Sequence, residues 1–172
     1  MKLVDVNYVQ WENTSREWRI EGVKLGPLTL LVGSNASGKS RTLNIINGLA
    51  KFLAGDSKVS ILSGSWTVTF EDEGKHLVYT LQISDAKVVK EEFKVDGTER
   101  LKRGAGGIGK IWAEKIGETG ETIDFQVPED QLAAVARLDS IQHPFFEPLH
   151  AWGKSLYHYP FGSPLGKDVL GL

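Results

Sequence analysis

The run Gly33-Ser-Asn-Ala-Ser-Gly-Lys-Ser40 constrains the fold of this chain more than any other segment. It satisfies the Walker A pattern G-x-x-x-x-G-K-[S/T], in which the backbone N–H groups of a glycine-rich loop surround phosphate oxygens. An apolar run at 28–32 precedes it and is typical of a buried strand, and a helical pattern follows it. A loop between a strand and a helix N-terminus gathers N–H groups and the positive end of the helix dipole. The sequence therefore predicts a phosphate site at residues 33–40.

Two side chains of this run have predicted roles of their own. Lys39 would reach the β- and γ-phosphates of a nucleotide, and the Ser40 hydroxyl would be a ligand of Mg²⁺. The composition also excludes the chemistry of one residue type. The chain has no cysteine, which excludes disulfides, thiolate catalysis and cysteine zinc sites.

Length and charge favour one ordinary domain. The chain has 172 residues, of which 41% are hydrophobic and 24% charged, and its net charge is −2. This balance gives no electrostatic indication of nucleic-acid binding, although a partner protein or DNA remains possible. We find no leader peptide and no apolar run of about 18 residues, so we expect a cytoplasmic protein without a membrane span.

The pattern of apolar residues divides a single, incomplete domain of 1–172 into three parts. Residues 1–56 would form the subdomain of the phosphate loop, 57–127 an antiparallel β-lobe, and 128–172 short helices and a tail. The first part has expected strands at 2–11, 17–25 and 28–32 and a helix at 40–53. The expected β-lobe strands are 66–70, 76–84, 87–95, 108–116 and 122–127, with 101–110 containing a glycine-rich basic loop. The last part has expected helices at 128–138 and 145–154 and a strand at 156–161.

Several other patterns fall short of a site. The run 104–110 also contains G-x-x-x-x-G-K, but no Ser or Thr follows it and no helix is expected after it, so we expect a loop between strands. The run 62–65 resembles the start of an ABC signature loop, yet a strand follows it. The four histidines have no metal-ligand spacing. No apolar strand ends in Asp-Glu, although an ATPase with a Walker A loop would use such a pair to hold Mg²⁺ and polarise the attacking water.

The third residue of the loop, Asn35, and the form G-x-N-x-S-G-K-S make the chain similar to a known group. The loop resembles that of the ABC-type ATPases of the SMC, RecF and OLD-like group, often described as AAA-family ATPases. The resemblance implies an α/β fold, namely a P-loop NTPase N-terminal lobe in which a mixed β-sheet surrounds the helix after the loop. An antiparallel β-meander would follow that lobe.

The resemblance also implies which residues bind the nucleotide. The loop residues and the two that follow it would bind the phosphates, with the backbone of the last two near the α-phosphate. Gln142 would contact Mg²⁺, although an ordinary glutamine at a helix end fits the sequence too. Trp11 and Arg16 would contact the adenine, with a packed Trp and a solvated Arg as the alternative. The phosphate-binding set is Gly33, Ser34, Asn35, Ala36, Ser37, Gly38, Lys39, Ser40, Arg41 and Thr42.

We therefore expect the ATP-binding part of an ABC/RecF-like ATPase that takes ATP and Mg²⁺. In that group, hydrolysis needs a C-terminal strand and a signature loop from a second protomer, so a full-length form would homodimerise. We expect the isolated chain to hydrolyse ATP weakly or not at all. One alternative is a non-catalytic module that binds a nucleotide or a partner. The other is a P-loop kinase, which would need an Arg-rich lid that the sequence lacks.

Overall fold

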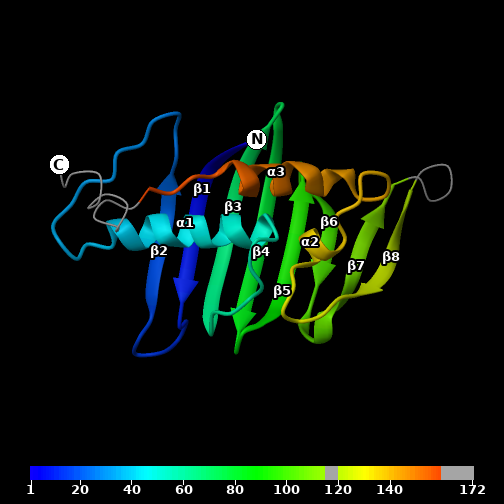
Figure 1. Ribbon diagram of the computed structural model, residues 1–172, viewed down its shortest axis with the longest axis horizontal. Coiled ribbons are helices and arrows are strands. Elements are labelled where there is room, and N and C mark those ends of the chain that lie inside the picture. The colour runs from blue at the N-terminus through cyan, green and yellow to red at the C-terminus, as the bar shows by residue number, and fades with distance from the viewer. Residues whose placement is uncertain (115–119, 160–172) are drawn as a thin grey trace, which may run out of the picture.

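One antiparallel sheet forms the framework of the protein. The computed structural model describes residues 1–114 and 120–159. Within them, eight strands lie in the order β2-β1-β3-β4-β5-β6-β7-β8, and every neighbouring pair is antiparallel (Figure 1). The strands are β1 (Lys2–Gln10), β2 (Trp18–Lys24), β3 (Ser63–Asp72), β4 (Lys75–Ser84), β5 (Lys87–Val95), β6 (Thr98–Arg103), β7 (Ile108–Ala113) and β8 (Glu121–Gln126).

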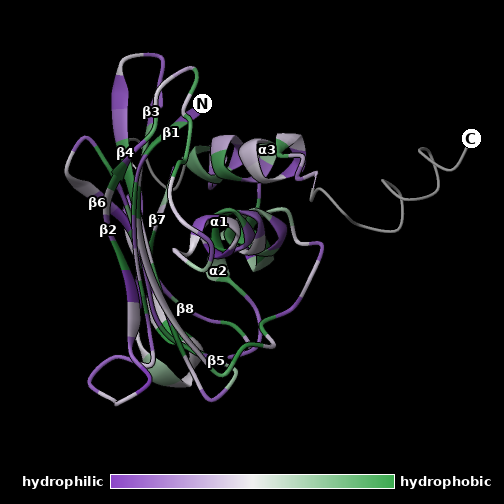
Figure 2. Ribbon diagram, turned by 90° about the vertical axis from the view of Figure 1, so that its left-hand side faces the viewer, coloured by the Kyte–Doolittle hydropathy of each residue, from purple (hydrophilic) through white to green (hydrophobic). Residues whose placement is uncertain are grey.

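The helices cover one face of this sheet and leave the other open (Figure 2). They are α1 (Lys39–Leu53), α2 (Ala133–Ala136) and α3 (Glu147–Ser155), with 3₁₀ turns η1 (Ala105–Gly107) and η2 (Pro144–Phe146). Side chains alternate between the faces of a strand. In β3, Trp66, Val68 and Phe70 are buried beneath the helices, whereas Thr67 is exposed on the open side. This alternation is typical of an antiparallel sheet with one solvated face.

Aromatic side chains fill the space between the sheet and the two longer helices. Trp66 packs against Tyr8 of β1, with ring centroids 4.7 Å apart, and against Phe52 of α1 at 6.2 Å. Trp152 of α3 packs edge-on against Phe70 at 4.9 Å. α1 and α3 touch through their backbones at Gly153, where a Cβ would lie 2.6 Å from the carbonyl oxygen of an α1 residue. This close packing fixes α1, and with it the loop that precedes it.

The structure corrects the expected fold class. A P-loop NTPase lobe with a mixed sheet around α1 requires residues 28–32 to form a buried strand beside α1. These residues form no strand, and Leu28, Leu30 and Val32 are 93%, 81% and 78% exposed. The sheet ends at β2, and the segment that joins β2 to α1 lies beyond that edge (Figure 1). A continuous apolar run is typical of a strand that is buried on both faces of a sheet, and no described strand pairs with this one.

Most other elements agree with their predictions. The elements that lie at or close to their predicted ranges are β1, β2, α1, β3, β4, β5, β7, β8 and α3. Residues 115–116 of the predicted 108–116 strand lie outside the described residues. The prediction missed β6, and it was wrong about a long helix at 128–138, of which only α2 forms. In the predicted final strand, residues 156–159 have no strand structure, and 160–161 lie outside the described residues.

Candidate functional site

The glycine-rich loop has the backbone geometry that its glycines permit. α1 begins at Lys39, and the residue before it, Gly38, has φ +92° and ψ 2°. This left-handed conformation strains residues with a Cβ. A Cβ on Gly38 would also lie 3.3 Å from the Trp18 ring, and one on Gly33 would lie 2.8 Å from Ser37 Oγ. Both glycines of the motif therefore occupy positions where other residues fit poorly.

The lysine of the motif lies inside the curve of the loop. Lys39 Nζ donates hydrogen bonds to the carbonyl oxygens of Gly33 and Ser34, both at 2.7 Å, and to Ser37 Oγ at 3.3 Å. All three acceptors belong to the loop, and none of them is a carboxylate. The ammonium group is therefore placed at the loop without a described anionic partner. Thr42 takes a structural position, because its hydroxyl donates to the carbonyl oxygen of Gly38 at 3.1 Å.

The loop opens on a cavity that includes part of the first hairpin. The cavity has a volume of about 520 Å³ and is lined by Trp18 of β2 and by residues 35–41. The Arg41 guanidinium stacks over the Trp18 ring, 4.0 Å from its centroid, and Arg41 Nη2 donates to Gln10 Oε1 at 2.5 Å. β1 and β2 pair Gln10 with Trp18, so the end of the hairpin meets the first turn of α1 here.

The donors around the loop suit an ion that arrives with its ligand. Ser40 lines the cavity and supplies one hydroxyl. In residues 1–114 and 120–159, no group of three or more His, Cys, Asp or Glu side chains could hold a metal ion. Mg²⁺ keeps several waters and is commonly held by substrate phosphates with few protein ligands. The residues present therefore fit Mg²⁺ carried in by a phosphate ligand, with Ser40 as its protein contact.

Three residues predicted to take part lie away from this cavity. Trp11 and Arg16 stack on each other in the β1–β2 turn, with the guanidinium 4.5 Å from the ring centroid, and neither lines the cavity. Gln142 lies beside β7, where its carbonyl oxygen accepts the Glu114 N–H at 2.8 Å. Because β7 is six strand positions from β2 and strands are about 4.8 Å apart, Gln142 lies roughly 25–30 Å from the loop. The fold does not bring Gln142 together with Ser40.

Trp18, which lines the cavity, and Gln10, which binds Arg41, were not predicted from the sequence. Gln10 and Trp18 precede the first loop residue, Gly33, by 23 and 15 positions, and only the pairing of the hairpin brings them to Arg41. One signal in the sequence was available. From Gly22 to Gly55 the chain contains Lys24, Lys39, Arg41 and Lys51 but no Asp or Glu, which marks a locally cationic segment in a chain of net charge −2.

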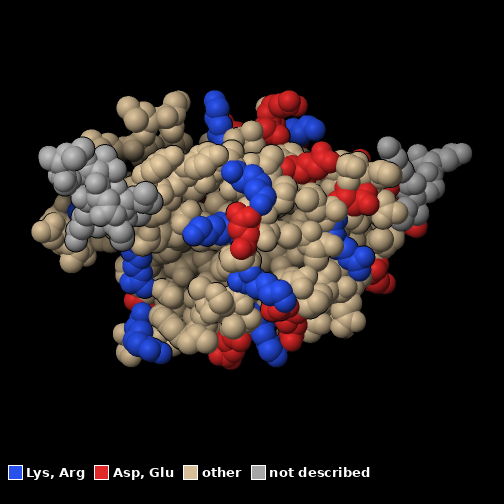
Figure 3. Space-filling model, in the orientation of Figure 1, with Lys and Arg blue, Asp and Glu red and all other residues tan. Residues whose placement is uncertain are grey.

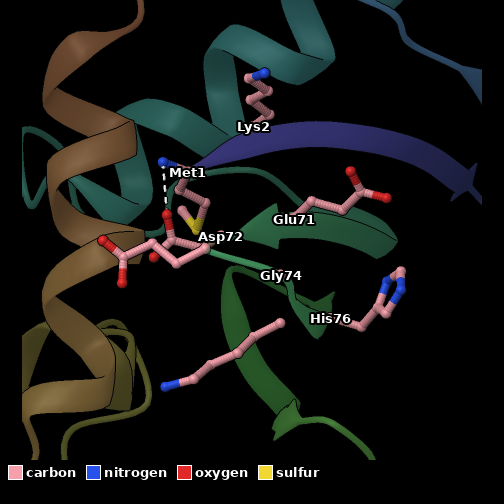
Figure 4. Close-up of a pocket in the computed structure, with 8 residues that line it drawn as sticks. Met1, Lys2, Glu71, Asp72, Gly74 and His76 are labelled. Atoms are coloured by element: carbon pink, nitrogen blue, oxygen red, sulfur yellow. Dashed lines mark ion pairs between the residues drawn. The ribbon is translucent and has the colours of Figure 1, made fainter.

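A second cavity, of about 630 Å³, lies at the turn between β3 and β4 and is lined by Met1, Lys2 and residues 71–76. Its charged groups do not converge on one point. The Met1 ammonium pairs with Asp72 at 2.8 Å, while Lys2, Glu71 and His76 point away from one another (Figure 4). On the helix-bearing face, basic and acidic side chains are interspersed (Figure 3). Neither feature indicates a ligand class, so the loop cavity is the stronger candidate.

In the described part of the chain, no helix is long and apolar enough to cross a membrane. Comparisons with protein-family models, with curated proteins and with solved structures find no match to this chain.

Proposed function

We propose that this chain binds the phosphates of MgATP through residues 33–42, as the ATP-binding part of an ABC/RecF-like ATPase. Lys39 would bind the β- and γ-phosphates, Ser40 would contact Mg²⁺, and the backbone N–H groups of the loop and of the first turn of α1 would bind phosphate oxygens. The observation that carries the proposal is the position of Lys39. Its ammonium lies within hydrogen-bond distance of the loop carbonyls of Gly33 and Ser34, at the mouth of a cavity large enough for phosphate groups.

Energetic considerations support an anionic ligand. An ammonium gains more from a phosphate than from neutral carbonyls, because opposite charges then attract each other in addition to the hydrogen bond. Among the described residues Lys39 has only neutral acceptors, so a phosphate would exchange weaker contacts for stronger ones. The choice of ATP rests on the resemblance of the Asn35-containing loop to those of ABC/RecF-like ATPases.

Binding and hydrolysis are separate in this proposal. Activation of the attacking water in phosphoryl transfer uses a positioned polar or acidic residue. Among the described residues that line the loop cavity there is no Asp or Glu. We therefore expect nucleotide binding with little turnover, and a homodimer or further polypeptide would be needed for full activity.

Isothermal titration with MgATP tests the proposal. The wild-type chain should bind, and Lys39→Ala should weaken binding about 10-fold or more, because it removes a charge-assisted contact. Lys51→Ala is the matched control, since Lys51 is an exposed lysine at the other end of the same helix. Absence of wild-type binding at millimolar MgATP, or equal loss in the two variants, would refute the proposal.

A further inference from the structure

The cavity holds a second cation, Arg41, whose described partners are neutral. Arg41 lies in the acid-free stretch between Gly22 and Gly55. Its partners are the Trp18 ring and the Gln10 amide oxygen, both of which are neutral. In the described residues no carboxylate lies within ion-pair distance of it, whereas Arg19 pairs with Glu17 and Glu21. The charge of Arg41 is therefore held in place, and no carboxylate of the described residues neutralises it.

The contacts of Arg41 are weaker than those that a phosphate would offer. Guanidinium groups match phosphate oxygens with two parallel hydrogen bonds, and a phosphate adds the attraction of opposite charges, which neutral partners lack. Arg41 lines the same cavity as Lys39 and Ser40, and its side chain is long and exposed. An anion in the cavity would therefore compete well with Trp18 and Gln10 for the guanidinium.

We propose that Arg41 is a second phosphate-binding residue, held by Trp18 and Gln10 while the loop is empty and transferred to the ligand when a polyphosphate binds. The inference rests on the proposed function of the loop. Two cations, Lys39 and Arg41, line the same cavity, and this favours a chain of two or three phosphates over a single phosphate. The ligand class is therefore a nucleoside di- or triphosphate or inorganic tripolyphosphate.

The proposal predicts different effects on ligand binding for the two residues of the Arg41–Gln10 hydrogen bond. Arg41→Ala should weaken the binding of tripolyphosphate and of MgATP about 10-fold, because a charged phosphate contact is lost. Gln10→Ala should leave binding unchanged or strengthen it up to about 3-fold, because the guanidinium no longer has to leave a partner. Arg16→Ala is the matched control, since Arg16 also stacks on a tryptophan but lies outside the cavity.

The experiment is a titration of the four chains with tripolyphosphate and MgATP, each chain first shown to unfold at the wild-type temperature. Wild-type binding with an unchanged Arg41→Ala affinity overturns the inference and leaves the proposed function intact. Equal weakening in Arg41→Ala and Gln10→Ala also overturns it, because Arg41 would then act only as a structural link to the hairpin. Failure of the wild type to bind either ligand overturns the proposed function and the inference together.

Discussion

Glu91 of β5 and Arg103 of β6 form an ion pair that is closed off from solvent, with Arg103 Nη1 3.2 Å from Glu91 Oε2 and side chains that are 0% exposed. The pair also holds the segment after β8 onto the sheet. Glu91 accepts the N–H groups of Ala133 and Ala134 at 2.7 and 3.0 Å, and the Tyr79 hydroxyl at 2.9 Å. Arg103 donates to the carbonyl oxygens at positions 131 and 128, at 2.6 and 2.9 Å. Sheet and α2 are thereby joined through one polar cluster.

Removing one member of this pair should destabilise the protein strongly. Arg103→Met leaves the Glu91 carboxylate buried without its counter-ion, and breaking a buried pair in this way costs about 3–5 kcal/mol. We expect that decrease in the free energy of unfolding, measured by urea denaturation. Glu91→Gln should cost a similar amount. The double variant should cost less than the sum of the two, because neither charge is then left alone.

The neighbouring pair, which is partly exposed, is the control for that experiment. Lys90 and Glu92 lie 3.3 Å apart with side chains 44% and 19% exposed, and exposed pairs contribute about 0–1 kcal/mol. Glu92→Gln should therefore change the free energy of unfolding by less than about 1 kcal/mol. A loss in Arg103→Met no larger than this would contradict the assignment of a structural role to the buried pair.

Tyr8 should make the stability of the protein depend on alkaline pH. Burial disfavours the phenolate and raises the pKa of Tyr8 to about 12, although the nearby Arg41 lowers it in part. The unfolded chain loses this proton near pH 10. Between about pH 10 and 12 the folded state therefore binds more protons than the unfolded state, and the free energy of unfolding falls as pH rises.

Urea denaturation from pH 9 to 11 tests this dependence. The wild type should lose stability with rising pH more steeply than Tyr8→Phe, which has no ionisable group at position 8. Burial and the Glu91 charge raise the pKa of Tyr79 as well, so some slope should persist in the variant. Parallel slopes in the two proteins would contradict the prediction.

The elements that the sequence predicted correctly have patterns visible within each element. Trp66, Val68 and Phe70 alternate with polar residues in β3, and this spacing indicates a half-buried strand whatever its neighbours are. The helical spacing in α1 is equally local. The motif likewise indicated a loop followed by a helix from residues that are adjacent in the sequence, and α1 begins at Lys39.

The elements that the sequence missed depend on contacts between distant residues. α2 begins only at Ala133, where Glu91, about forty residues earlier, accepts the N–H groups of Ala133 and Ala134. β6 looked like a basic loop, yet Arg103 faces the core because Glu91 lies opposite it in β5. Trp18 likewise meets Arg41 only because the hairpin packs against the start of α1. Spacing along a single sequence does not reveal such pairs.

The effect of Gly38 on stability and its effect on ligand binding can be separated by substitution. Gly38→Ala places a Cβ at φ +92° and 3.3 Å from Trp18, so it should cost about 1–2 kcal/mol of stability and reduce MgATP binding. Gly74→Ala has a similar φ of +81° but meets no atom within 4 Å. It should lose about the same stability by thermal denaturation and bind MgATP as the wild type does. Equal binding by both variants would show that the loop conformation is not needed for phosphate.

Substitution at Leu30 tests whether residues 28–32 are exposed, as in the structure, or form a buried strand. If residues 28–32 formed a strand buried within a sheet, replacing Leu30 with a polar residue would cost several kcal/mol. In the structure Leu30 is 81% exposed, so Leu30→Thr should change the free energy of unfolding by no more than about 0.5 kcal/mol. Leu49→Ala is the comparison, because Leu49 of α1 is 1% exposed and its truncation should cost about 2–5 kcal/mol. Urea denaturation of both variants measures the difference. A cost at Leu30 that approaches the cost at Leu49 would mean that another strand covers this segment in solution, since only burial gives a leucine that weight.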